Sequence, residues 1–179
     1  MRRTDAQPTT RSRSLIAAIT LSAVIAILAT VGALYAAGRL TVAQPARQAQ
    51  VHAMGAGVMP FDLNKTTHIF RMTEAGGVQQ VVAKDTSDAT QIALIQQHLQ
   101  HEAMQFQAGD FVDPMALHGA DMPGLSQLQA GAAKISVIYT PLPDGAQLTY
   151  TTSDPQLITA LHQWFGAQLS DHGQDATDH

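Results

Sequence analysis

The longest apolar stretch of the chain lies close to its N-terminus. Residues 15–37 (LIAAITLSAVIAILATVGALYAA) contain no charged side chain, and roughly 20 apolar residues are enough to cross a hydrocarbon core of about 30 Å. The apolar part of a cleaved secretory signal is shorter, about 7–15 residues. The pattern therefore favours a transmembrane helix over residues 14–37 that stays attached, with cleavage near the small residues Ala33–Ala37 as the alternative.

Basic residues around this stretch predict its orientation. Four arginines and one aspartate precede it, and only Arg39 and Arg47 follow it closely. Positively charged flanks stay in the cytoplasm. We therefore expect a cytoplasmic tail over residues 1–13 and a single pass through a bacterial inner (cytoplasmic) membrane, with the C-terminal part in the periplasm. The four arginines are Arg2, Arg3, Arg11 and Arg13.

Beyond the span, the pattern becomes that of a linker and one small domain. Residues 38–58 mix Gly, Ala, Gln and Pro without a sustained apolar period, which is typical of a tether. The domain is expected over residues 59–172, and the polar residues 173–179 are expected to form a disordered tail. A domain of roughly 115 residues can bury enough surface to be stable alone.

Two β-hairpins are expected within the domain, each followed by a helix. The first two β-prone runs flank a Glu-Ala-Gly-Gly turn, and the second two flank a longer turn that contains proline and glycine. Asp88 and Asp154 follow the hairpins and suit helix N-caps, the second with Pro155 at the first helical position. The four runs are residues 68–72, 78–83, 135–139 and 146–151.

The two expected helices have matching apolar stripes. A shift of 66 positions superposes Asp88 on Asp154 and Leu99 on Phe165, which suggests a ββα–ββα duplication, although any two capped amphipathic helices would match this well. The expected fold class is α+β: an N-terminal transmembrane helix plus a four-stranded, mainly antiparallel sheet with two helices on one face. The stripes are Ile92, Ile95, Leu99 and Phe106, and Ile158, Leu161, Phe165 and Leu169.

Charge and cysteine content exclude several classes of function. From Met59 onward the chain has four Lys or Arg and thirteen Asp or Glu residues, a net charge of −9 with histidine neutral. A nucleic-acid partner needs a basic surface, which this acidic domain lacks. The same negative charge disfavours phosphorylated substrates. The chain has no cysteine, so disulfides, thiolate metal sites and c-type haem attachment are excluded.

Histidine and methionine are the chemically informative residues. On the expected first helix, His98 and Glu102 are four positions apart and can share a target at the margin of the core. The long connection over residues 107–125 carries His118 and Met122, and such loops are often functional. Imidazole with thioether suits copper, particularly Cu(I), whereas imidazole with carboxylate suits zinc or Cu(II). These four side chains are the predicted metal ligands, with copper or zinc as the metal.

The alternative is that these side chains are structural. Histidines on a helix flank are commonly solvated, and methionines often fill gaps in a core. The Met-Pro-Gly-Leu sequence at residues 122–125 is typical of a short helix, ending at Gly131. His162 is expected on the inward side of the second helix, Trp164 at its packing edge, and His172 at its end, where a cation favours the helix dipole.

Three segments of the domain resemble a family of small exported bacterial proteins without an established role. They are MPFDLNKTTHIF, GDFVDPMALHGADMPGL and YTTSDPQLITALHQWFGAQLSDHG, which begin at Met59, Gly109 and Tyr150. Some similar proteins are catalogued as aspartate carbamoyltransferase. That enzyme grips carbamoyl phosphate with a Ser-Thr-Arg-Thr loop and further basic residues. This domain has no such loop and one arginine, Arg71, so we predict no turnover.

Three functions follow as hypotheses. The first is a membrane-anchored periplasmic binding or accessory module without catalysis that holds copper or another transition metal. The second is a protein-interaction module of an inner-membrane complex, in which the histidines are incidental. The third is an enzyme for a small substrate, as the carbamoyltransferase label implies. The expected partners are the membrane, through residues 14–37, and a membrane protein; nucleic acid is excluded.

Overall fold

The computed structural model describes residues 44–179. The predicted cytoplasmic tail, residues 1–13, and the predicted membrane span, residues 14–37, lie outside the described residues. Within the described part, no helix combines the length and the apolar character needed to cross a bilayer.

Part of the expected linker is a helix that belongs to the domain. Residues 44–55 are helical, with Pro45 in the first turn, where proline is well tolerated. Alanine, glutamine and arginine in this stretch favour a helix, and Val51 is completely buried against the domain. The linker expected over residues 38–58 is therefore folded from residue 44 onward.

Both expected hairpins form. β1 (Thr66–Thr73) pairs antiparallel with β2 (Gly76–Ala83), and β3 (Ser136–Leu142) pairs antiparallel with β4 (Gly145–Thr151). β2 and β4 also pair antiparallel, which joins the hairpins into one sheet in the order β3-β4-β2-β1-β5.

A fifth strand corrects the expected four-stranded antiparallel sheet. After α5 (Pro155–His172), the chain reverses at Gly173, whose φ of +55° lies in the left-handed region that favours glycine. One 3₁₀ turn, η3 (Gly173–Asp175), leads into β5 (Ala176–Thr177), which lies parallel to β1. The sheet is therefore five-stranded and mixed. The disordered tail expected from residue 173 is wrong over residues 173–177, because pairing with β1 orders this end.

The two long helices begin at the predicted caps. α2 (Ala89–Gln107) follows Asp88, whose carboxylate accepts a hydrogen bond of 3.2 Å from the backbone N–H of Gln91. α5 follows Asp154, which accepts one of 3.0 Å from the backbone of Gln156. Both caps are confirmed, and each satisfies a backbone donor that the first turn of a helix leaves free.

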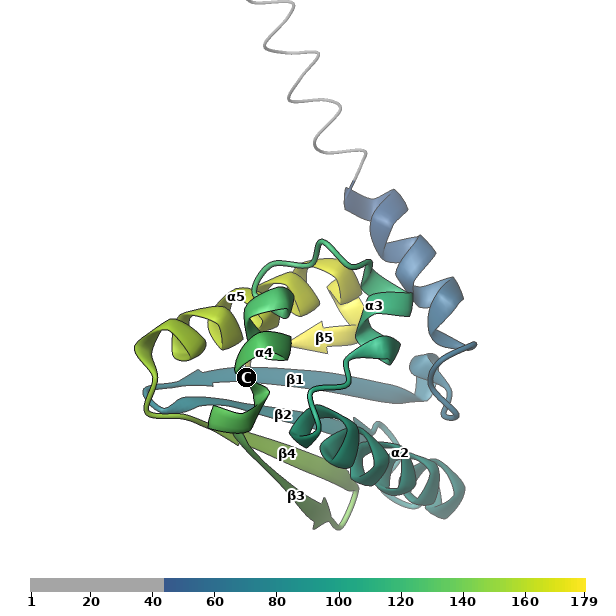
Figure 1. Ribbon diagram of the computed structural model, residues 1–179. Helices are drawn as coiled ribbons and strands as arrows, with labels where there is room; N and C mark the ends of the chain where they lie inside the picture. Colours follow the sequence, from purple (N-terminus) through teal and green to yellow (C-terminus); the bar gives the residue numbers. More distant parts are fainter. Residues whose placement is uncertain (1–43) are drawn as a thin grey trace, which may run out of the picture. The chain divides into compact units, whose positions relative to one another are not determined.

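Both long helices cover the same face of the sheet (Figure 1). α2 packs on β3 and β4, and α5 packs on β1 and β2. The ring of Tyr150, from the interior strand β4, lies 6.3 Å from that of Phe106 on α2 and 5.7 Å from that of Phe165 on α5. One layer of side chains therefore joins the sheet to both helices.

Shorter elements complete the domain. η1 (Leu63–Lys65) precedes β1, α3 (Val112–His118) follows α2, and α4 (Leu125–Gly131) with η2 (Ala132–Lys134) precedes β3. α4 is the short helix predicted to end at Gly131. A side chain at Gly124, just before α4, would collide with the backbone carbonyl of Ala160 on α5, so this glycine lets the two helices approach closely.

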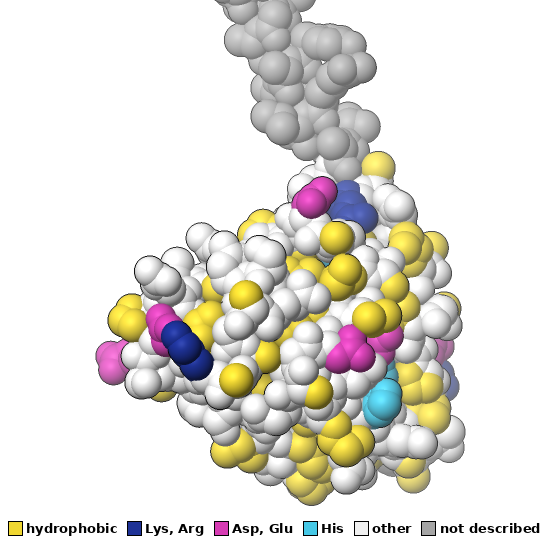
Figure 2. Space-filling view, in the orientation of Figure 1, with side chains coloured by type: hydrophobic (Ala, Val, Ile, Leu, Met, Phe, Trp, Pro, Cys, Tyr) yellow, Lys and Arg dark blue, Asp and Glu magenta, His cyan; other side chains and the backbone are white. Residues whose placement is uncertain are grey.

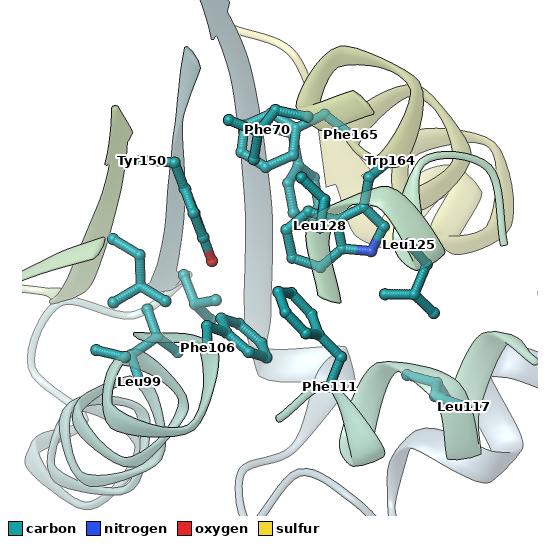
Figure 3. Packing of buried hydrophobic residues seen from close by; sticks show 14 of the residues in the cluster. Phe70, Leu99, Phe106, Phe111, Leu117, Leu125, Leu128, Tyr150, Trp164 and Phe165 are labelled. Atoms are coloured by element: carbon teal, nitrogen blue, oxygen red, sulfur yellow. The ribbon is translucent and has the colours of Figure 1, made fainter. Parts of the chain in front are cut away.

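An aromatic cluster fills the core between α2, α4, α5 and β4 (Figure 3). Trp164 lies at its centre and is completely buried. Its ring packs edge-to-face against those of Phe106, Phe111 and Tyr150, each with a centroid distance of 5.8 Å. The expectation that Trp164 lies at a packing edge is therefore wrong: α4 and the Phe111 segment cover the side of α5 that the apolar stripe leaves open.

Candidate functional site: a buried histidine cavity

A small cavity of about 30 Å³ lies between the sheet and helices α2, α3 and α5. This volume has room for a water molecule or a metal ion. Seven buried polar side chains line it, and they come from five different elements. They are His68 of β1, Gln79 of β2, His98 and Glu102 of α2, His118 of α3, and Gln168 and His172 of α5.

The first histidine–carboxylate pair lies on α2. His98 Nε2 is 3.4 Å from Glu102 Oε1, and the two side chains are only 8% and 10% exposed. Burial alone would lower the pKa of His98, but the hydrogen bond and the charge of Glu102 outweigh it, so this pKa is raised. The sequence places the pair at the margin of the core. In the structure it lies on the buried face of α2, between Ile95 and Phe106.

The second pair joins α3 to the end of α5. His118 Nδ1 lies 2.9 Å from Asp171 Oδ2, and Arg47 Nη2 contacts the same oxygen at 2.7 Å. Burial would raise the pKa of Asp171, but Arg47 and His118 outweigh it, so this pKa is lowered. The ionised carboxylate therefore accepts a hydrogen bond from Nδ1–H of His118, and Nε2 of the neutral ring keeps its lone pair. This is how proteins orient an imidazole that binds a metal or a reacting group.

His68 and His172 form a stacked pair inside the cavity wall. Their ring centroids are 4.8 Å apart with an interplanar angle of 13°, and both residues are only 4% exposed. Burial lowers the pKa of His68 well below its ordinary value and that of His172 to about 4. Both rings are therefore neutral near pH 7. The expectation that His172 is a cation serving the helix dipole is wrong, because the end of α5 is buried.

The buried ring of His68 is not fully satisfied by hydrogen bonds. Its strand pairs with β5 at Ala176, which places the ring beside the end of the chain. Nδ1 of His68 is buried and has no hydrogen-bond partner within residues 44–179, so this nitrogen is available to a ligand. Nδ1 of His172 and Oε1 of Gln168 are also buried without a partner among the described residues, and all three side chains line the same cavity.

The structure separates the four predicted ligands. His98, Glu102 and His118 line the cavity, whereas Met122 is a buried core residue that lines a groove on the outer side of His118. Met59 takes the position expected for Met122, because its largely buried side chain belongs to the cavity wall. Within residues 44–179, no three His, Asp or Glu side chains are arranged so that they could hold a metal ion together.

Sequence reasoning missed three potential metal ligands that line this cavity: His68, His172 and Met59. His68 and His172 are 104 positions apart and meet only because the end of α5 packs on β1. A usable signal was the alternation along β1, which places His68 on the same face as the buried Phe70. No comparable signal marks Met59, which lies outside the helices and strands.

The wall of the cavity favours a cation over an anion. It contains Glu102 and Asp113 but no Lys or Arg. Neutral imidazole, thioether and carboxylate groups donate electron pairs to metals, whereas a phosphorylated substrate needs basic side chains. On the face seen in Figure 2, basic side chains are scattered and lie beside acidic ones. The basic phosphate-binding side chains implied by the aspartate carbamoyltransferase label therefore have no counterpart in this cavity.

Comparison with protein-family models, with curated proteins and with solved structures gives no match for this chain. The buried cavity is therefore the feature of this chain that can indicate a function.

Proposed function

We propose that this protein is a membrane-anchored periplasmic binding module that holds Cu(I) in the buried histidine cavity. His68, His172 and Met59 are the proposed ligands. The observation that supports this most strongly is the pair of buried imidazole nitrogens, Nδ1 of His68 and Nδ1 of His172, which have no hydrogen-bond partner within residues 44–179.

A binding role gives these unpaired nitrogens a physical reason. Each buried polar group without a partner costs about 1–3 kcal/mol. An apolar residue would avoid that penalty, yet β1 and α5 each supply a histidine to the same cavity. A bound metal ion accepts the lone pair of Nδ1 of His68 and removes the penalty. A water molecule bridging the same atoms is the competing explanation, and it predicts no metal affinity.

Cu(I) suits this cavity better than zinc. Structural zinc is almost always held by four ligands in a tetrahedron, and the described residues offer no group of even three His, Asp or Glu side chains in position. Cu(I) is stable with two or three soft ligands, and a thioether such as that of Met59 favours it. Two imidazoles and one thioether form such a set without cysteine.

A copper titration tests this proposal. The full-length protein, purified in a mild detergent under anaerobic conditions, is titrated with Cu(I) in competition with a chromogenic chelator. We expect one equivalent to bind with a dissociation constant below about 10 μM. Zn(II) titrated in the same way should bind more weakly.

Four variants identify the ligands. His68→Phe and His172→Phe keep the ring volume and should each weaken Cu(I) binding at least about tenfold, which is about 1.4 kcal/mol. His101→Gln, at an exposed position of α2, and Met122→Leu, outside the cavity, are matched controls that should bind like the wild type. Affinity weaker than about 10 μM in the wild type, or equal affinity in all five proteins, would remove the copper proposal.

The anchored location has its own test. Residues 14–37 are the proposed anchor, and a phosphatase reporter that folds only outside the cytoplasm is fused after His179. We expect an active reporter that remains with the membrane fraction. A fusion that is active only with a cytoplasmic reporter would contradict the proposed topology.

A further inference from the structure

A second hollow lies on the outer side of His172. It has a volume of about 480 Å³, and its lining includes His52, His172 and Asp175. His172 also lines the buried cavity, so this residue borders both spaces. We call this second space, bordered by helix 44–55 and the turn after α5, the outer hollow. It contains a histidine that the proposed function leaves without a role.

His52 is held in the outer hollow by an acidic partner. Its Nδ1 lies 2.6 Å from Asp175 Oδ2; the His52 side chain is 36% exposed, whereas that of Asp175 is 9% exposed. The carboxylate orients the ring through Nδ1, which leaves Nε2 for a metal ion, as carboxylates behind metal-binding histidines commonly do. Asp175 also directly precedes Ala176, which pairs with His68 of β1. Asp175 therefore lies next to a histidine of each space.

Two other approaches to the cavity are less suited to a cation. The groove beside Met122 reaches His118, but Arg47 lines this groove and forms a salt bridge with Asp171. The positive charge of Arg47 repels an arriving cation. The rim formed by α3 contains Asp113 but no exposed histidine. The outer hollow alone among these three combines a partly exposed imidazole with a wall free of Lys and Arg.

We propose that the outer hollow is the route by which Cu(I) reaches the buried cavity, with His52 as its first ligand, His172 as its second and Asp175 as a positioning residue. This inference rests on the proposed function. The Cu–N bond to His52 breaks as the Cu–N bond to His172 forms, and the metal stays Cu(I) throughout, so the transfer needs neither an oxidant nor a reductant.

Loading kinetics test this route. The full-length protein is mixed in a stopped-flow instrument with the Cu(I)–bathocuproine disulfonate complex, whose colour is lost when copper leaves it. We expect His52→Ala to slow loading at least about tenfold while the equilibrium affinity changes less than about twofold, because a residue on the access route acts on the association rate. Asp175→Asn should slow loading less, because His52 remains.

Asp113→Asn removes a carboxylate from the other rim and tests that alternative route. The matched control is Glu74→Gln, at an exposed position of the turn between β1 and β2, which should load at the wild-type rate. A wild-type rate in His52→Ala would overturn the route. A parallel loss of rate and affinity in His52→Ala would also overturn it, because His52 would then belong to the final site. Slower loading in Asp113→Asn but not in His52→Ala would assign the route to α3 instead. A wild-type protein without Cu(I) affinity would overturn both proposals, and equilibrium titration shows this before any rate is measured.

Discussion

The two halves of the core, the aromatic cluster and the histidine cavity, differ sharply although α2 and α5 contribute to both. Toward the end of α2, Phe106 enters an aromatic cluster, whereas one and two turns earlier Glu102 and His98 enter the polar cavity. α5 does the reverse: Trp164 packs in the cluster and His172 ends in the cavity. Each helix thus changes from a packing to a chemical role within eight residues. The aromatic cluster around Trp164, which we call the aromatic half, can account for the stability of the domain. The cavity lined by histidines, which we call the histidine half, needs a different explanation.

The largest expected effect follows from damage to the aromatic half. Trp164→Ala removes a completely buried indole that packs against four other aromatic rings, so we expect the free energy of unfolding to fall by about 3–5 kcal/mol. Urea denaturation followed by circular dichroism measures it, because the variant has lost the only tryptophan. A loss below about 1 kcal/mol would mean that this half does not dominate stability.

Acid should weaken the fold through the histidine half. The pKa of His172 is about 4 in the folded protein, against about 6.5 in an unfolded chain. The unfolded chain therefore takes up this proton first as the pH falls. The stability from a neutral His172 is complete above pH 6.5 and is lost progressively toward pH 4, by about 3 kcal/mol in all.

Other histidines adjust the size of this acid effect. His68, with its pKa also lowered by burial, acts in the same direction as His172. His98 opposes them, because its raised pKa adds stability as the pH falls through the folded value toward the unfolded value of about 6.5, and this contribution is complete below that pH. Urea unfolding of the metal-free protein between pH 7.5 and 4.5 measures the sum. Stability that does not change over this range would contradict the assignment of neutral, buried imidazoles.

The smallest expected change in stability comes from replacing a histidine of the cavity. In His172→Phe the phenyl ring can keep the stack on His68 and removes an unpaired Nδ1. We expect the free energy of unfolding at pH 7.5 to stay within about 1.5 kcal/mol of the wild-type value. We also expect the loss of stability between pH 7.5 and 4.5 to be smaller than in the wild type. His101→Gln should leave the acid decline unchanged. A loss comparable to that in Trp164→Ala would erase the difference between the two halves.

Local patterns in the sequence predicted the hairpins and helix caps correctly. Turn residues between β-prone runs and an aspartate ahead of each helix act on backbone groups only a few residues away. For the same reason, the pair of His98 with Glu102 could be found from its spacing of four. The burial of that pair could not, because it depends on which neighbour covers the flank of α2.

What the sequence determined by itself is therefore what a few consecutive residues decide: the strands, the caps, the acidic charge, the absence of cysteine, and the single apolar stretch on which the predicted anchor rests. Tertiary structure alone decided that the tail adds a strand beside β1, that Trp164 is central, and that His68 meets His172. Those outcomes depend on contacts between segments roughly fifty to a hundred residues apart. Such contacts form only when the whole core closes, so no local pattern specifies them.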